Sequence, residues 1–194
     1  MSNPKGIRGT IGDLWWCVTA GVLTFMSFPV RPVPESSLWP LTWVCLVPLL
    51  YALRGASPKR AFLYGAVMGG VTNFGGFWWI FNVLRDFGHL PDAVAWGLTG
   101  LDAIYQGLQF GVFGALLARV GHSDGQGRPR IWVMATLFVA VEHIFPMIFP
   151  WYLGNSQYRF LPAVQIAEIL GVAGVTFTLV LANGLALDLA LNRR

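Results

Sequence analysis

Long apolar segments place the strongest limit on how this chain can fold. Six of them stand out, at about residues 14–28, 38–53, 61–84, 93–120, 131–148 and 163–191. A helix needs about 20 residues to cross the hydrocarbon core of a bilayer, and the last four segments are long enough. The first two are shorter and contain or adjoin proline, so we expect tilted spans, thin spans or a re-entrant pair. The sequence predicts an all-α, polytopic membrane bundle of about six transmembrane helices, forming one integral membrane domain over residues 1–194.

The charge content excludes several other classes of protein. Only 11% of the residues are charged and 55% are apolar, whereas soluble domains average about 25% charged residues. This excludes a disordered chain and argues against a water-soluble domain. Basic stripes typical of nucleic-acid binding are absent, so no nucleic-acid partner is expected. Cys17 and Cys45 lie inside apolar segments without metal-ligand spacing, and we expect neither a metal site nor a cofactor.

The basic residues predict how the bundle is oriented in the membrane. If every segment crosses, ten of the thirteen Lys and Arg residues fall on one side, and these are Lys5, Arg8, Arg54, Lys59, Arg60, Arg119, Arg128, Arg130, Arg193 and Arg194. Basic loops are retained in the cytoplasm, so both chain termini are expected there. The first apolar run lacks a small-x-small cleavage site and is predicted to be a retained span rather than a signal peptide.

Two aromatic loops are predicted to lie at the opposite, outward rim of the bundle. They are residues 77–91, FWWIFNVLRDFGHLP, and residues 149–157, FPWYLGNSQ. Tryptophan is favoured where hydrocarbon meets water, whereas a charged group such as Arg85 is costly in lipid. On chemistry alone, Trp151 and Tyr152 are interface anchors.

Glycine pairs spaced four residues apart occur in two of the segments. They are Gly65 with Gly69, and Gly107 with Gly111. Such pairs of small residues let helix backbones approach closely in lipid and gain packing contacts. They predict a tightly packed bundle.

Polar residues inside the segments form another pattern. At 100° per residue, an arc of about 80° holds Thr99, Asp102, Gln106 and Gln109. Glu142 and Glu168 lie in the same outer half of the predicted membrane. An ionised carboxylate at the bilayer centre costs about 2.5–3.5 kcal/mol, so these groups should face the bundle interior, a water-filled cleft or one another. Two interpretations stand side by side: a polar cavity open to the outer face, or hydrogen bonding between helices with protonated or rim-exposed carboxylates.

In order and spacing, these runs resemble a known family. The run FWWIFNVLRDFGHLP, followed by a long apolar segment and a basic loop, is similar to bacterial apolipoprotein N-acyltransferase. The later runs VEHIFPMIFPWYLGNSQ (141–157) and FLPAVQIAEILGVAGVTF (160–177) fit the same family. The resemblance extends from about residue 14 to residue 191.

The resemblance implies a multi-pass enzyme of the bacterial inner membrane. Such an enzyme moves an acyl chain from a phospholipid to the N-terminal diacylglyceryl-cysteine of a lipoprotein, using a Glu–Lys–Cys triad on an outer nitrilase-like domain. That domain is not found here: Lys5 and Lys59 are predicted to be cytoplasmic, Cys17 and Cys45 lie within spans, and no catalytic residue is predicted. The implied role is to hold acyl chains of phospholipid and lipoprotein, with a separate nitrilase-like catalytic subunit as a candidate partner.

We predict that an outward constellation of residues faces the lipid. It consists of Trp79, Phe87, Gly88, Pro91, Glu142, Phe149, Pro150, Trp151, Ser156 and Gln157. The tryptophans are expected to be anchors or acyl-chain walls, and Ser156 and Gln157 to offer hydrogen bonds to a headgroup or an overlying domain. Two alternatives stay open: a non-catalytic lipid-binding scaffold and, ranked last, a small transporter whose carboxylates line a substrate path.

Overall fold

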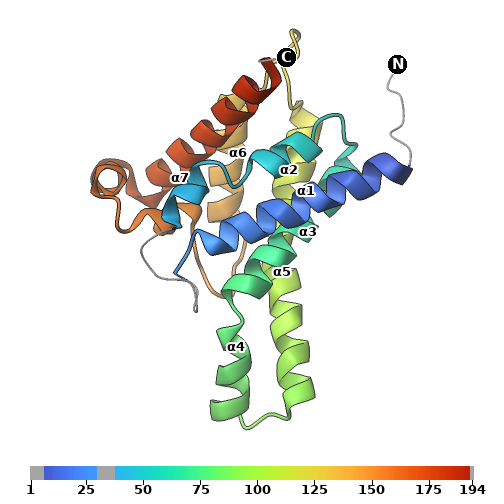
Figure 1. Cartoon of the computed structure of the whole chain (residues 1–194). Coiled ribbons are helices and arrows are strands. Elements are labelled where there is room, and N and C mark those ends of the chain that lie inside the picture. The colour runs from blue at the N-terminus through green and yellow to red at the C-terminus, as the bar shows by residue number, and fades with distance from the viewer. Residues whose placement is uncertain (1–6, 30–37, 193–194) are drawn as a thin grey trace.

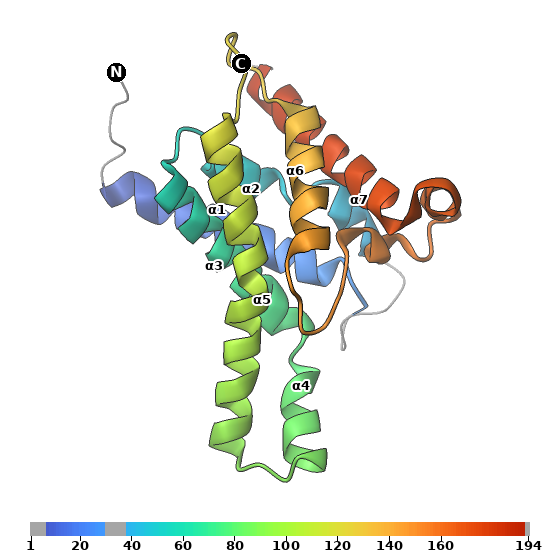
Figure 2. The same ribbon diagram turned by 180° about the vertical axis from the view of Figure 1, so that it is seen from behind.

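In the computed structural model, residues 7–29 and 38–192 are described, and every regular element among them is a helix. In chain order they are α1 (Ile7–Met26), the 3₁₀-helix η1 (Trp39–Trp43), α2 (Val47–Ala52), α3 (Pro58–Gly76), α4 (Trp79–Asn82), the π-helix η2 (Val83–Phe87), α5 (Asp92–Val120), α6 (Ile131–Ile144), the 3₁₀-helix η3 (Leu153–Gln157) and α7 (Leu161–Asn192). A hairpin of α4, η2 and the first half of α5 projects from one end of the bundle, and the C-terminal end of α7 lies at the other end (Figures 1 and 2).

Helices α3 and α5 approach each other very closely, and the glycines explain why. A Cβ atom added at Gly65 would lie 2.0 Å from the Phe110 carbonyl oxygen, and one added at Gly69 would lie 2.3 Å from that of Gly107. A Cβ at Gly114 would lie 2.4 Å from the Ala61 carbonyl oxygen. Only residues without a side chain allow backbones to come this near, so the predicted close packing is confirmed for these two helices.

The first two apolar segments differ in their helical structure. α1 begins at Ile7, so Arg8 lies within this helix rather than before it. Residues 38–53 are not one continuous helix but two short ones, η1 and α2, each with a proline in its first turn. Proline has no backbone N–H to donate, so Pro40 and Pro48 are tolerated at helix starts and would break a longer helix running through them.

Two further segments end earlier than their hydropathy suggests. The predicted helix over 61–84 stops at Gly76, and after Phe77 the chain restarts as α4 and η2. α6 stops at Ile144 because Phe145, which precedes Pro146, adopts an extended backbone (φ −65°, ψ 128°). The chain then follows a loop over residues 145–152 to η3. α5, in contrast, matches its predicted range of 93–120 to within one residue.

The last helix is divided at Gly171, whose φ of +65° and ψ of −173° are not helical. That backbone is accessible to glycine and strained for other residues. Figure 1 shows the segment before the break at an angle to the rest of α7. α5 and α7 are the described helices with the length and apolar composition to cross a membrane. Six crossings and cytoplasmic termini stay predictions.

The glycine-rich connection between α5 and α6 is tied to the bundle at its start. The Nε2 atom of buried His122 lies 2.8 Å from the Leu50 carbonyl oxygen. Arg130 donates from Nη1 to the Val120 carbonyl (2.9 Å), closing the loop across its base. Burial lowers the pKa of His122, because the imidazolium form loses hydration.

Candidate lipid-facing site

The loop between α6 and α7 is held by polar side chains from several helices. Glu142 near the end of α6 accepts a hydrogen bond from the backbone N–H of Leu153 through Oε1, at 2.7 Å. The next residue, Gly154, donates its N–H to the hydroxyl of Thr176 on α7, at 3.0 Å. Both donors belong to buried residues at the start of η3. Glu142 therefore positions this loop, because it satisfies an amide that is out of reach of bulk water.

Helix α5 holds the first part of the same loop. Phe149 donates its N–H to Oε1 of Gln106 (3.2 Å), and the Tyr105 hydroxyl donates to the carbonyl of Pro146 (2.6 Å). Gln106 also donates through Nε2 to Oδ2 of Asp102 (3.3 Å). Gln106 therefore bonds to the loop and to its own helix, and neither of these two hydrogen bonds joins one helix to another. The two interpretations of the polar arc both stay open.

Helix α3 fixes the side chain at the centre of the loop. The indole Nε1–H of Trp151 donates to Oδ1 of Asn73 at 3.0 Å, and Asn73 in turn donates to the Gly69 carbonyl at 2.8 Å. Asn73 has no exposed surface. The ring of Trp151 is therefore anchored at its polar edge while its apolar face is left for packing.

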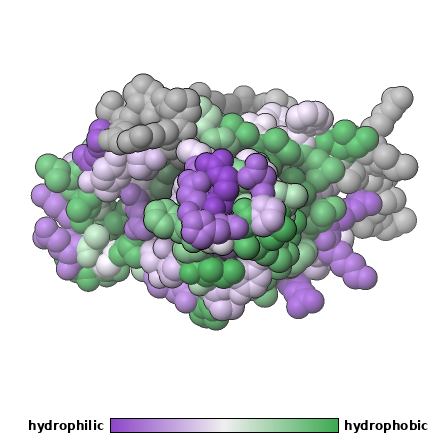
Figure 3. All heavy atoms as spheres, turned by 90° about the horizontal axis from the view of Figure 1, so that it is seen from below, coloured by the Kyte–Doolittle hydropathy of each residue, from purple (hydrophilic) through white to green (hydrophobic). Residues whose placement is uncertain are grey.

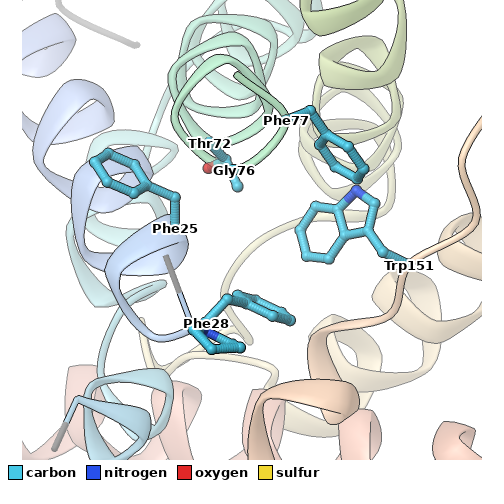
Figure 4. A pocket seen from close by; sticks show the side chains of 7 residues that line it. Phe25, Phe28, Thr72, Gly76, Phe77 and Trp151 are labelled. Carbon is cyan, nitrogen blue, oxygen red and sulfur yellow. The ribbon is translucent and has the colours of Figure 1, made fainter. Parts of the chain in front are cut away.

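Trp151 forms one wall of an apolar cavity of about 210 Å³ at the C-terminal ends of α1 and α3. The cavity is lined by Phe25, Phe28, Pro29, Thr72, Gly76, Phe77 and Trp151. Figure 4 shows the phenyl rings and the indole arranged around the open space, with Gly76 presenting no side chain to it. Phe28 contacts Trp151 edge to face, with 5.2 Å between ring centroids. We call this space the Trp151 cavity.

Other aromatic residues predicted for the site lie close by. Phe149 packs on Phe77, with 6.0 Å between centroids, and on Trp79, with 5.7 Å. The structure therefore brings together Trp79, Phe149 and Trp151, and Pro150 lies between the last two in the chain. The two rims predicted from sequence meet at this aromatic cluster.

Phe87, Gly88 and Pro91 lie apart from this cluster, at the tip of the projecting hairpin. Figure 3 looks onto this end and shows a hydrophilic centre bordered by hydrophobic surface. Arg85 donates from Nε to Oδ1 of Asp86 at 2.8 Å, and this hydrogen bond lowers the pKa of the Asp86 carboxyl. Phe87 is 83% exposed, so it fits an interface position rather than the wall of a closed site.

Ser156 and Gln157 do not face outward as predicted, because both are completely buried. Gln157 accepts a hydrogen bond from the Trp43 indole (3.1 Å) and donates to the Trp39 carbonyl (3.2 Å). Ser156 accepts from the Thr42 hydroxyl (3.0 Å). These groups join η3 to η1 and are not directed at a headgroup or an overlying domain.

The three carboxylates predicted to lie inside the membrane differ in their surroundings. Asp102 and Glu142 are buried, whereas Glu168 is exposed on the segment before the break at Gly171 and does not face the bundle interior. Among the described residues, Asp102 Oδ1, Glu142 Oε2 and both amide atoms of Gln109 are buried without a hydrogen-bond partner. No group of three His, Cys, Asp or Glu residues suited to a metal ion occurs within residues 7–29 and 38–192.

Sequence reasoning missed the α1 and α3 residues of the Trp151 cavity. Phe25, Phe28 and Thr72 give no signal in an apolar sequence, because aromatic and threonine residues are ordinary there. Asn73 did give a signal in the sequence, because a polar amide in the middle of an apolar segment needs a hydrogen-bond partner in lipid. Its partner proved to be Trp151.

Close glycine contacts between helices, exposed large apolar side chains and two helices long and apolar enough to cross a membrane are features typical of a helical membrane domain. Comparison with known proteins gives the family. The model of the apolipoprotein N-acyltransferase N-terminal domain matches residues 20–185, and the chain belongs to this family.

Similar proteins carry the same family name. An apolipoprotein N-acyltransferase of Geobacter metallireducens is 34% identical over 175 residues, which cover 88% of this chain and 32% of the relative. An apolipoprotein N-acyltransferase 2 of Leptospira interrogans is 32% identical, covering 81% of this chain and 26% of the relative. A Bdellovibrio bacteriovorus relative is 29% identical, covering 88% and 31%. The chain thus spans about a third or less of the length of these relatives.

Proposed function

We propose that these residues form the membrane-embedded domain of a lipoprotein N-acyltransferase, and that the Trp151 cavity holds an acyl chain for transfer to a lipoprotein. The Glu–Lys–Cys chemistry belongs to a nitrilase-like catalytic domain outside these 194 residues. In this proposal the domain is a multi-pass protein of the bacterial inner membrane, with six crossings, cytoplasmic termini and the aromatic cluster facing outward.

The observation that carries the proposal is the apolar, aromatic wall of the Trp151 cavity. Of its lining residues, Thr72 has the one polar side chain besides the indole, and its hydroxyl already donates to the Met68 carbonyl at 3.0 Å. The indole N–H is likewise used by Asn73. The cavity therefore offers little to a polar ligand, whereas each methylene group buried there contributes about 0.8 kcal/mol.

The loop geometry supports the same proposal. Trp151 reaches the cavity from a loop that is fixed by hydrogen bonds to α3, α5, α6 and α7. Because four helices hold it, the Trp151 side of the cavity has a defined position relative to any domain that packs against this end of the bundle. A fixed position matters for acyl transfer, since reacting groups must approach within about 3–3.5 Å.

A photo-crosslinking experiment tests acyl-chain binding directly. Phosphatidylethanolamine with a diazirine in one acyl chain is mixed with the chain in nanodiscs, illuminated, and the labelled peptides are identified by mass spectrometry. We expect label on the peptides that contain Phe77 and Trp151. Gly76→Leu fills the cavity from a position with no heavy atom within 4 Å of a new Cβ, and should remove most of this label.

Gly97→Leu is the matched control. Gly97 is equally open, with nothing within 4 Å of an added Cβ, but it lies on α5 away from the cavity. Equal labelling of wild type, Gly76→Leu and Gly97→Leu would contradict acyl-chain binding in the cavity.

The catalytic part of the proposal needs a second test. Sequencing the DNA after codon 194 shows whether a nitrilase-like reading frame follows, and N-acylation of a diacylglyceryl peptide is then assayed in the assembled enzyme. Trp151→Ala should lower this activity strongly, because the cavity loses its wall. Unchanged activity would exclude a role for the cavity in the reaction.

A further inference from the structure

The side-chain amide of Gln109, in the middle of α5, is buried and has no partner among the described residues. Gln109 is 3% exposed, and neither its Oε1 nor its Nε2 forms a hydrogen bond. Gln106, three residues earlier on the same helix, uses both ends of its amide, for Phe149 and Asp102. An unpaired buried amide is destabilising, so we expect the partner of Gln109 to be a bound molecule.

The residues on either side of Gln109 place it against α6. Four residues before it, Tyr105 packs on Phe145 at the end of α6, with 5.7 Å between ring centroids. Four residues after it, Phe113 packs on Phe138 of α6, with 5.1 Å between centroids. Residues four apart lie above one another on the same face of a helix. Gln109 therefore lies on the face of α5 that α6 covers.

Glu142 lies at the same level on α6. It falls between Phe138 and Phe145, the residues through which this helix meets the two rings of α5. The later contact on α6 pairs with the earlier contact on α5, so the two helices run in opposite directions and Glu142 is opposite Gln109. Glu142 is 2% exposed, and its Oε2 has no hydrogen-bond partner among the described residues.

The Glu142 carboxyl keeps capacity for a ligand. Its Oε1 accepts the Leu153 N–H, and the Thr176 hydroxyl of α7 interacts with the same carboxyl group. That hydroxyl has one hydrogen to donate, whereas the two oxygens of a carboxylate together accept about four hydrogen bonds. No hydrogen bond joins Glu142 directly to Gln109. The two side chains thus offer a donor and acceptors toward the same part of the contact between α5 and α6.

The chemistry of these groups defines what can bind. The ligand must both donate and accept hydrogen bonds, since Gln109 offers N–H groups and both side chains offer oxygen. It must be small, because Phe113, Phe138 and Val141 around this point are themselves buried. Water meets both conditions, and buried waters typically form about three hydrogen bonds to groups that the protein leaves unpaired.

We infer that one buried water molecule bridges Gln109 and Glu142 and so links α5 to α6. It accepts a hydrogen bond from Nε2 of Gln109, donates one to Oε1 of the same amide, and donates the other to Oε2 of Glu142. Because Glu142 also holds the Leu153 N–H, the water connects α5 to the start of η3. The proposed function makes no use of this site.

A crystal structure of the full chain grown in a lipid mesophase, at a resolution that shows ordered water, tests this inference. We expect one peak of electron density about 2.7–3.2 Å from Nε2 of Gln109 and about 2.5–3.0 Å from Oε2 of Glu142. Gln157 is the control in the same map. It is completely buried, but its Nε2 donates to the Trp39 carbonyl and to the Ser156 hydroxyl, so no water should bond to that atom.

Two variants identify the ligand. Gln109→Leu removes the amide while keeping a side chain of similar size, and its map should lack the peak. Glu142→Gln keeps an oxygen and a nitrogen that can bond to water, so the peak should persist. A bound cation would depend on the negative charge of Glu142 instead, and rubidium in place of sodium would give it an anomalous signal.

Three outcomes would overturn the inference. They are a wild-type map without a peak between Gln109 and Glu142, a peak that persists in Gln109→Leu, and a rubidium signal at the site, which would assign it to a monovalent cation. The wild-type map alone decides the first and third outcomes, so a variant that fails to fold leaves the test intact.

Discussion

Replacing Gly69 by alanine should weaken the contact between α3 and α5. The added Cβ would lie 2.3 Å from the carbonyl oxygen of Gly107 and 2.6 Å from its Cα atom, whereas ordinary contact begins at 3.4 Å. The clash is with backbone, which cannot rotate away as the end of a side chain can. The two helices must therefore separate by about 1.1 Å at this point, the difference between the two distances.

The cost follows from the contacts that this separation loosens. A gap of about 0.5–1 Å already removes a quarter to a half of the dispersion attraction between two surfaces. Gly65 and Gly114 lie on the same contact, with equally short approaches, so their neighbours lose packing as well. Overpacking of this kind typically costs about 1–3 kcal/mol, and we expect a free energy of unfolding lower by about 2 kcal/mol.

Thermal and denaturant unfolding of the purified chain in detergent measure this effect. Gly97→Ala is the control, because a Cβ there meets no heavy atom within 4 Å. It should be neutral or stabilising by up to about 1 kcal/mol, since alanine favours the helix over glycine. If Gly69→Ala unfolds at the same temperature and denaturant concentration as Gly97→Ala, the close approach does not hold the helices together and the reasoning is refuted.

Three other predictions concern buried polar groups. Glu142→Ala leaves the Leu153 N–H without an acceptor and should lower stability by about 1–3 kcal/mol; Glu142→Gln keeps an acceptor, and an equal loss in both variants would contradict this account. Burial lowers the pKa of His122, so protons bind the unfolded state more tightly and the melting temperature should fall as pH drops below about 6.5. His122→Gln should flatten that pH dependence, and parallel curves would exclude it. Asn73→Leu should cost about 0.5–1.5 kcal/mol and shift the indole N–H resonance of Trp151; an unshifted resonance would argue against the hydrogen bond.

Helix positions were predictable where side-chain size or hydropathy alone decides them. The range of α5 follows from an uninterrupted apolar run, and its contact with α3 follows from glycines that recur every fourth residue. The break at Gly171 was not predictable, because an apolar stretch continues on both sides of it. A glycine within a helix and a glycine with φ of +65° look identical in the sequence.

The candidate site was predictable as a region and less so as a set of side chains. Aromatic residues of both rims do meet, as Trp79 and Phe149 show. Ser156 and Gln157 point inward, because a turn of 3₁₀-helix can direct a polar side chain to either side and the partly buried indole N–H of Trp43 needed an acceptor. That need becomes visible only when residues 114 positions apart in the chain are brought together.

The link between α2 and α7 has a consequence for the order of assembly. Asn183 accepts a hydrogen bond from the Leu46 N–H (2.8 Å) and donates to the Thr42 carbonyl (2.9 Å), across 137 and 141 positions of the chain. The ribosome synthesises η1 and α2 long before α7. Until α7 has been synthesised, the backbone N–H at the start of α2 lacks its side-chain acceptor. It must then donate to water or to another polar group. η1 and α2 therefore become a fixed part of the bundle only after α7 has been synthesised, and a ribosome stalled before codon 183 would leave them without these two hydrogen bonds.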